Sequence, residues 1–290
     1  MKSKKLKKWT TLVTCATALT VMAACSQSNS QATGTTSSTT SKTSAVTVTT
    51  SKKTNKNNSN YFTSKDSDTS YNESSATKIK LSGSSADVSG DGAALSGSTV
   101  TISKAGTYVI SGKSDGVQIK VDAGDSDDVH IVLDGATMTN TNAAINATKA
   151  GHVYLTLKDG TTNTLSDSSS NSDEDADAVI FSKGDLTING TGTLNIDAKK
   201  NNGIKANDSL PMTGGTYKIS SVGDAFNVND ELNITGTTMT IEAEEDAVKV
   251  NNDDDTSAGT MYLSDNTMTI KAGNDGIHAS GALIFYSGTY

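Results

Sequence analysis

The chain has 290 residues, a formal net charge of −8 and 34% hydrophobic residues, and all 24 of its basic residues are lysines. An acidic chain without arginine is a poor partner for nucleic acid, whose phosphates attract basic surfaces. Both cysteines, Cys15 and Cys25, lie in the first 25 residues, which excludes disulfides and thiol chemistry from the remainder. The length is sufficient for one domain with a continuous core.

The first 24 residues have the pattern of a bacterial export signal. Five lysines between positions 2 and 8 precede the apolar stretch WTTLVTCATALTVMAA (9–24), which is too short for a membrane-spanning helix. The small residues in VMAAC resemble a lipobox, so we expect cleavage after residue 24 and lipidation of Cys25, with palmitate among the acyl groups. Ordinary secretion is the alternative. Cleavage would remove five lysines and no acidic residue, which takes the net charge from −8 to −13.

Residues 25–75 are mostly Ser, Thr, Asn, Gln and Lys. Such a segment buries too little apolar surface to offset the entropy of ordering, so we predict a disordered tether that spans about 40 Å on average. It would hold the folded part away from a membrane on its outer, extracellular side. From residue 76 apolar and polar residues alternate, which predicts strands, and we take 76–112 as an N-terminal β cap.

Residues 113–290 contain a repeated step of an acidic or amide residue, a small residue and an apolar residue. The shortest interval between steps is 22 residues and occurs twice in succession. Each step is followed by a second strand, a turn and a third strand, which together describe one coil of a parallel β-helix. The steps predict one interior ladder: Val117, Ile145, Val179, Ile204, Phe226, Val248 and Ile277.

Two further interior ladders follow from the second and third strands. The second is Leu186, Leu210, Leu232, Met261 and Leu283, and the third is Leu194, Tyr217, Met239, Met268 and Tyr290. The last eight residues, LIFYSGTY, match LPMTGGTY (210–217), where the coil goes on with a further strand. The pattern therefore predicts an all-β solenoid whose last coil would continue beyond Tyr290.

Three features carry a family resemblance: VTISKAGTYVISG (100–112), AINATKAGHVYLTLKDGTTNTLSD, and coils of DAV or NGI with LTINGTGTLNI. Together they resemble the carbohydrate-binding domain-containing lipoproteins of Gram-positive bacteria. That family is similar to pectate lyases in its right-handed parallel β-helix. The resemblance implies that fold, polysaccharide from plant walls or another acidic glycan as the ligand, and calcium bound on the helix. It carries no catalytic motif.

Four aspartates fall at one corner of the predicted coils, which makes them candidate metal ligands: Asp177, Asp224, Asp246 and Asp275. Equivalent residues of stacked coils lie about 4.8 Å apart, where carboxylates without a cation repel one another. Calcium takes six to eight oxygens from carboxylates, amides and carbonyls, and further oxygens lie close by in Asp175, Asn227, Asn229, Asp230, Asn251 and Asn252. The alternative is that Asp and Asn cap turns here.

The residue after each interior position points outward and predicts a row of Gln118, Asn146, Ile180, Lys205, Asn227, Lys249 and His278. Lys205, Asn227, Lys249 and His278 are candidate carbohydrate-binding residues, because ammonium and amide groups bind uronates and hydroxyls. Tyr262 is a further candidate, since it alternates outward and an exposed ring stacks on a sugar. A solvated outer face is the alternative.

No residue is predicted to be catalytic. Pectate lyases commonly use arginine as the base, and this chain has none, although Lys205 or Lys249 lies in a suitable neighbourhood. The sequence therefore favours a lipid-anchored surface protein that binds polysaccharide without cleaving it. A calcium-dependent polysaccharide lyase or related hydrolase is the second hypothesis, and a structural or adhesive surface protein is the third.

Overall fold

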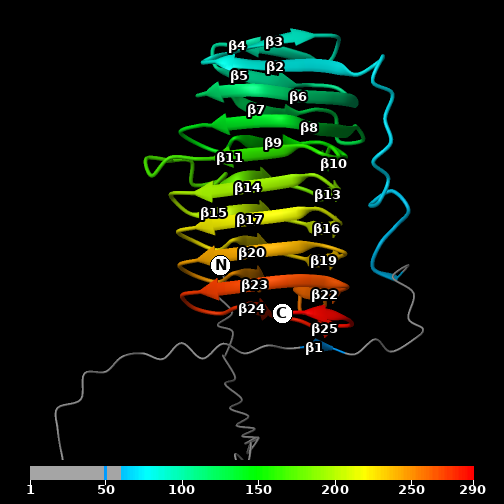
Figure 1. Cartoon of the computed structure of the whole chain (residues 1–290), viewed down its shortest axis with the longest axis vertical. Coiled ribbons are helices and arrows are strands. Elements are labelled where there is room, and N and C mark those ends of the chain that lie inside the picture. Colours follow the sequence, from blue (N-terminus) through cyan, green and yellow to red (C-terminus); the bar gives the residue numbers. More distant parts are fainter. Residues whose placement is uncertain (1–48, 51–59) are drawn as a thin grey trace, which may run out of the picture. The chain divides into compact units, whose positions relative to one another are not determined.

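The computed structural model describes residues 49–50 and 60–290. The predicted signal peptide, Cys25 and most of the predicted tether lie outside these residues. Strands and turns make up nearly all of the described part, wound as successive coils around one axis (Figure 1). None of the helical segments within the described residues has the length and apolar character needed to span a bilayer.

Each coil contributes one strand to each of three parallel sheet faces, as the alternating pattern predicts. Face A is one nine-stranded sheet: β4 (Ala93–Ser96), β5 (Thr99–Ile102), β7 (Gln118–Asp122), β9 (Ile145–Lys149), β12 (Ala178–Ser182), β15 (Asn202–Ala206), β18 (Phe226–Val228), β21 (Val248–Val250) and β24 (Ile277–Ala279). Face B contains β10 (His152–Leu157), β13 (Leu186–Gly190), β16 (Ser209–Thr213), β19 (Glu231–Thr235), β22 (Thr260–Ser264) and β25 (Leu283–Phe285). Face C contains β11 (Thr162–Ser166), β14 (Thr193–Ala198), β17 (Thr216–Ser221), β20 (Thr238–Ala243), β23 (Asn266–Ala272) and β26 (Gly288–Thr289).

The first coils join faces B and C and close the upper end of the stack. β6 (Gly106–Asp115) and β8 (Asp128–Thr139) are long strands, and β8 pairs with β10 through its first half and with β11 through its second. β2 (Thr77–Gly83) pairs antiparallel with β3 (Ser85–Ser89), as β4 does with β5. These hairpins cover the first coil (Figure 1), and at the other end β1 (Thr49–Thr50) pairs antiparallel with β26.

The second and third interior ladders are confirmed by the strand registers. Leu210 pairs with Leu232, Leu232 with Met261, and Met261 with Leu283 on face B. On face C the register joins the four residues Leu194, Tyr217, Met239 and Met268 in succession. Except for Leu283, which is 39% exposed in the last coil although it was predicted to be interior, these side chains belong to one continuous hydrophobic core that stacking extends from coil to coil.

The face A ladder is confirmed from Ile204 onward but is wrong in two earlier coils. Ile204, Phe226, Val248 and Ile277 pair in sequence, as the repeated step predicts, across two intervals of 22 residues and one of 29. Earlier in the chain Ile119 and Ile180 take the places predicted for Val117 and Val179. The outward row on face A is accordingly Lys120, Asn146, Phe181, Lys205, Asn227, Lys249 and His278, with Lys120 and Phe181 replacing Gln118 and Ile180.

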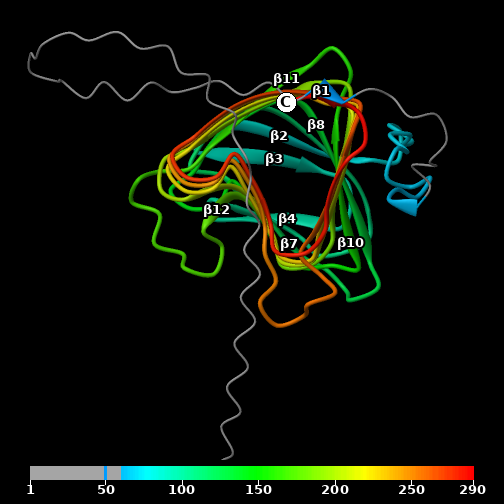
Figure 2. The ribbon, with the colours of Figure 1, turned by 90° about the horizontal axis from the view of Figure 1, so that it is seen from below.

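Two polar insertions project from the stack instead of disturbing it. The segment 167–177 lies between β11 and β12, and 251–259 lies between β21 and β22. Figure 2 shows them as a green and an orange loop outside the ring of coils. The second insertion leaves the strand register on both sides unchanged, and it becomes important for the candidate site.

Residues 60–75, here called the strap, lie along the outer surface of face B, although the sequence placed them in a disordered tether. Figure 1 shows the strap beside the coils, running along the axis from β2 toward the later coils. The Tyr61 ring stacks on Tyr262 with centroids 3.8 Å apart and an angle of 6°. Tyr71 covers an outward patch of Ala76, Val109 and Val132. These few aromatic side chains supply the burial that the composition of the tether lacks on average.

Two histidines of face B lie beneath the strap with lowered pKa values. Burial lowers the pKa of His130 from its ordinary 6.5, against the opposite effect of Asp68. Burial likewise lowers the pKa of His152, which stacks on Tyr154 at 4.2 Å. Their Nε2 atoms contact the hydroxyls of Thr156 and Thr187. The titratable and charged groups that face the two rings are Lys65, Asp66, Asp68, Tyr71, Asp128, Tyr154 and Asp185.

We predict that the fold loses stability as the pH falls below about 6.5. In that range the unfolded chain binds protons that the folded chain excludes from His130 and His152, so the free energy of unfolding decreases. Melting temperatures between pH 7.5 and 5.5 measure the slope. Replacing both histidines by Gln should flatten it, and a double variant with the slope of the wild type would contradict the assignment.

Candidate functional site

The corner before face A is built by side chains that cap the backbone of the next coil. The Asn202 Oδ1 atom accepts a hydrogen bond from the N–H of Asp224 at 3.1 Å, and Asp224 Oδ1 accepts one from Asp246 at 3.0 Å. Asp246 Oδ1 does the same for Asp275 at 2.9 Å. These caps satisfy backbone donors that the bend would otherwise leave buried, since Asp224 and Asp246 are only 2% and 4% exposed.

Lysines from the outward row of face A supply the charge that these carboxylates need. Lys249 Nζ lies 3.4 Å from Asp224 Oδ2 and 3.5 Å from Asp246 Oδ2, so it joins two successive coils. Lys205 Nζ lies 2.7 Å from Asp177 Oδ1 in the same way. The predicted conflict between stacked carboxylates is therefore relieved by ammonium groups and backbone N–H groups.

The pKa shifts follow from this arrangement. Burial alone would lower the pKa of Lys249, but the carboxylates of Asp224 and Asp246 raise it above its ordinary value. Burial alone would raise the pKa of Asp246, yet hydrogen bonds from Asp275 N–H and Asn274 together with Lys249 lower it. Both groups thus keep their charge at neutral pH, and Lys249 is a fixed cation.

The corner does not fit calcium at the positions expected from the sequence. Asp177, Asp224 and Asp246 already accept N–H donors on both carboxylate oxygens, and a calcium ion would have to replace them. Asp275, at the last coil, contacts His278 Nδ1 at 3.4 Å. Across residues 49–50 and 60–290, no three His, Cys, Asp or Glu side chains come together in a group able to hold a metal ion.

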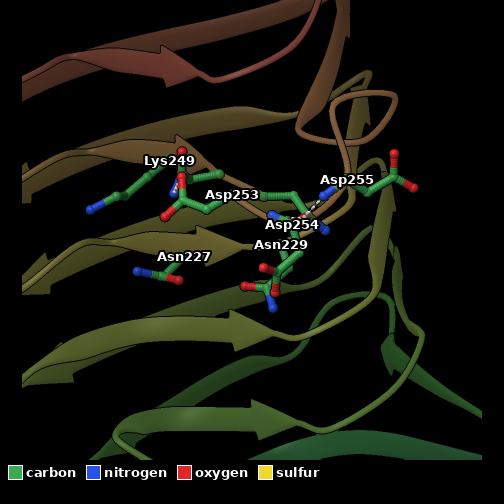
Figure 3. A pocket seen from close by; sticks show the side chains of 8 residues that line it. Asn227, Asn229, Lys249, Asp253, Asp254 and Asp255 are labelled. Carbon is green, nitrogen blue, oxygen red and sulfur yellow. Dashed lines mark hydrogen bonds between the residues drawn. The ribbon is translucent and has the colours of Figure 1, made fainter. Parts of the chain in front are cut away.

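A hollow of about 520 Å³ lies beside the corner, between the outward row of face A and the insertion 251–259. Figure 3 shows Asn227 and Lys249 projecting from neighbouring strands, with acidic side chains of the insertion across from them. Its lining is polar throughout: Asn227, Asn229, Lys249, Asn251, Asn252, Asp253, Asp254 and Asp255. The volume is in the usual range of small-molecule sites, but this one is lined by amides and charges.

The insertion is held in its bent shape by Asn252. Its Oδ1 atom accepts hydrogen bonds from the N–H groups of Asp254 and Asp255, at 3.0 and 2.8 Å. Its Nδ2 atom donates to Asp230 Oδ1 at 2.6 Å, which ties the loop to the preceding coil. The exposed carboxylates of the loop are therefore presented at the rim of the hollow. The sequence predicted Asn251 and Asn252 only as further oxygens near the corner, and it gave no sign that this stretch and Asn227 line one hollow.

The structure brings together some of the predicted carbohydrate-binding residues and separates others. Asn227 and Lys249 line the hollow, whereas Lys205 and His278 continue the same row in other coils. Tyr262 lies on face B and does point outward, opposite Asn233. It is nevertheless only 2% exposed, because Tyr61 of the strap covers it, so the expected open aromatic platform is wrong for this state.

Comparison with known proteins places this geometry in a family. The model of carbohydrate-binding domain-containing proteins matches residues 96–290, from the cap to the last coil. The chain belongs to this family. A solved structure, that of a polysaccharide lyase-like protein from C. thermocellum in a gadolinium derivative, is 28% identical. The match covers 72% of this chain and 96% of that one with a TM-score of 0.67, in agreement with the parallel β-helix.

A sequence relative from Acetivibrio thermocellus, described as a carbohydrate-binding domain-containing protein, is 36% identical over 137 residues. The match covers 45% of this chain, and the chain spans about half (48%) of that relative's length.

We predict that Asp224→Ala and Asp224→Asn differ sharply in stability. Alanine leaves the buried N–H of Asp246 without its acceptor and removes one of the two carboxylates that pair with Lys249, which costs about 3 kcal/mol. Asparagine keeps an acceptor, as Asn202 does one coil earlier, and costs about 1 kcal/mol. Urea unfolding measures both. Equal losses would show that the corner needs the charge of this carboxylate, as a bound cation would require.

Proposed function

We propose that the protein binds acidic polysaccharide without cleaving it, in the hollow formed by face A and the insertion 251–259. The observation that carries the proposal is Lys249, a cation that lines this hollow and is fixed by two buried carboxylates. The amides of Asn227, Asn229 and Asn251 surround it and offer hydrogen bonds to sugar hydroxyls. A uronate in the hollow would pair with the ammonium while its hydroxyls meet the amides.

Calcium would act at the rim and not at the corner. The insertion presents the carboxylates of Asp253, Asp254 and Asp255, which are the oxygen ligands that calcium prefers, but they form no complete site by themselves. Uronate oxygens from the polysaccharide would supply the missing ligands, so that the ion bridges protein and glycan. The gadolinium derivative of the similar C. thermocellum protein supports this reasoning, because a lanthanide ion also prefers oxygen ligands.

A polysaccharide lyase is the second candidate, favoured by the likeness to a protein described as polysaccharide lyase-like. Lyase chemistry needs a base that removes a proton beside the uronate carboxylate. The carboxylates beside Lys249 raise its pKa, which keeps it protonated and unsuited to that role. The charge state of this residue therefore favours binding over cleavage.

The export signal and Cys25 support a place on the outer side of the cell membrane, held by a lipid on Cys25. The polar segment that follows would give the coils reach toward a polymer outside the cell. Detergent-phase partitioning of wild type against Cys25→Ser tests the anchor, and a Cys25→Ser protein that still partitions with the membrane fraction would count against it.

We expect Lys249→Gln to weaken binding of polygalacturonate about tenfold or more, because a charge-assisted contact contributes about 1.5–3 kcal/mol. Calorimetric titration measures the affinity. Lys271→Gln is the matched control, since Lys271 carries the same charge on the distant face C and pairs there with Glu242. Asn229→Ala, which lines the hollow, should weaken binding as well. Unchanged affinity in both hollow variants would refute this site.

The same titration in the presence of a chelator tests whether calcium acts at the rim of the hollow. Chelation should weaken polygalacturonate binding but leave the melting temperature unchanged. Changing Asp253, Asp254 and Asp255 to Asn should remove the calcium dependence, whereas the matched change in the other insertion, Asp173→Asn, Glu174→Gln and Asp175→Asn, should not. A chelator-induced drop in melting temperature would place calcium in the fold. Absorbance of unsaturated uronides should stay at background, and their release would favour the lyase.

A further inference from the structure

The outward side chains of face B beneath the strap differ from those of the other solvent-facing surfaces. Along β10, β13, β16, β19 and β22 they are mostly short hydroxyls, amides and tyrosine rings: His152, Tyr154, Thr156, Thr187, Asn189, Ser209, Pro211, Thr213, Glu231, Asn233, Thr235, Thr260, Tyr262 and Ser264. Glu231, at the start of β19, is the one acidic side chain of this set. The corresponding positions of face C include exposed Lys218, Glu242 and Lys271, which are typical of a solvated surface.

These side chains hold the strap as they would hold a bound molecule. Asn189 Nδ2 donates to the backbone carbonyls of Asp66 and Asp68, at 3.2 and 3.1 Å. Thr213 Oγ1 donates to the Asp66 carbonyl at 2.8 Å, and Asn233 Nδ2 to the Tyr61 carbonyl at 2.9 Å. All of these donors are side-chain groups of face B. The strap is therefore bound by side chains across the strands and adds no strand to the sheet.

The remaining contacts are of the kinds that proteins use on ligands. The Asp66 carboxylate, only 6% exposed, accepts a hydrogen bond from Thr187 Oγ1 at 2.9 Å. Tyr61 stacks flat on Tyr262, and Lys65 lies 5.1 Å from the centre of the Tyr154 ring. The contacts extend over the coils from β22 back to β8, a distance of about 24 Å at 4.8 Å per coil.

The start of the strap does not fill the surface that it covers. A second hollow, of about 310 Å³, lies between Tyr61, Asp66, His152, Asp185 and Glu231, with Asn233 at its wall. Asn233 is 5% exposed, and among the described residues its Oδ1 atom has no hydrogen-bond partner. A buried carbonyl oxygen without a hydrogen-bond partner is unfavourable, and a ligand hydroxyl would supply the missing donor.

We propose that the middle of face B is a second carbohydrate site, for a linear neutral polysaccharide, and that the strap is its built-in competitor. Hydroxyl and amide donors at coil intervals match sugar hydroxyls along a chain, and the rings of Tyr154 and Tyr262 match sugar C–H faces. The carboxylates of Asp128, Asp185 and Glu231 border this groove and would repel an acidic chain, so the ligand is neutral. The inference shares with the proposed function only the carbohydrate class, because its site and its ligand differ.

The strap then sets the apparent affinity through the fraction of molecules in which it is open. An intrinsic dissociation constant is divided by that fraction, so a strap open in one molecule in a hundred weakens binding a hundredfold. Loosening the strap should raise affinity without any new contact, and a bound glycan should in turn release the strap.

The test compares the full chain with Tyr61→Ala/Asp66→Ala, which removes the ring stack and the buried carboxylate. The control is Ser67→Ala, in an exposed strap residue whose hydroxyl donates to the Ser64 carbonyl within the strap itself. The probes are linear hexasaccharides of glucose, mannose and xylose, measured by calorimetry. The double variant should bind one of them at least tenfold more tightly than wild type and the control. Adding Thr213→Val, which removes a donor of face B with little change of shape, should reduce that gain.

Hydrogen exchange of the strap amides supplies a second readout. In wild type, the hexasaccharide that binds should speed exchange in residues 60–71. Equal affinities in the double variant and wild type, or slower exchange of the strap amides with glycan bound, would show that the strap does not compete with the glycan. Either result would overturn the proposal. The outcome is independent of the first site, since Lys249→Gln should alter polygalacturonate binding only. Tighter binding of polygalacturonate by the double variant would show that the covered groove prefers acidic chains and overturn the assignment to neutral ones.

Discussion

Stacking at about 4.8 Å is the constraint on which the structure depends, because it sets every side chain beside its equivalent in the next coil. Apolar residues are stabilised by this repetition and form continuous ladders. Stacked acidic residues repel one another, and the chain relieves this repulsion in two ways. Asp224 and Asp246 each turn one oxygen to a backbone N–H of the next coil, and Lys249 bridges the other oxygens. Asn202 stands between Asp177 and Asp224 and interrupts the run of charge.

The register of face A was predictable wherever the repeated small residue keeps its place before the strand. Between Ile204 and Val248 two coils of 22 residues repeat, and the predicted register is correct. Earlier coils are longer, so the small residue used for alignment no longer marks the same place, and Val117 and Val179 were put where Ile119 and Ile180 lie. The strap escaped prediction for another reason. Asp66 bonds to Thr187, which is 121 residues away, and no periodicity in the strap itself signals that contact.

The candidate site, too, could be predicted only in part from the sequence. Asn227 and Lys249 were predicted to face outward together, since strand alternation and the 22-residue spacing suffice for that. That the lysine neutralises the corner aspartates was not predicted, because it depends on the direction of its side chain across two coils. The hollow also needs the insertion 251–259 to fold back over the row, a result of the hydrogen bonds made by Asn252. Tyr262 shows the same limit: its direction was predictable, but its cover was not.

The two proposed carbohydrate sites differ in their exposure to solvent. Face A keeps its charges in an open hollow, where Lys249 and a bridging calcium ion would offset the carboxylates of the insertion when an acidic chain binds. Face B has mainly uncharged side chains and aromatic rings, and an open aromatic surface favours association with other chains. The strap covers that surface with residues of the same chain. It can be displaced because individual side-chain contacts, and no strand pairing, bind it to face B. A polysaccharide that repeats the same contacts over several coils gains from each of them at once, which is how a longer ligand can displace a tethered competitor.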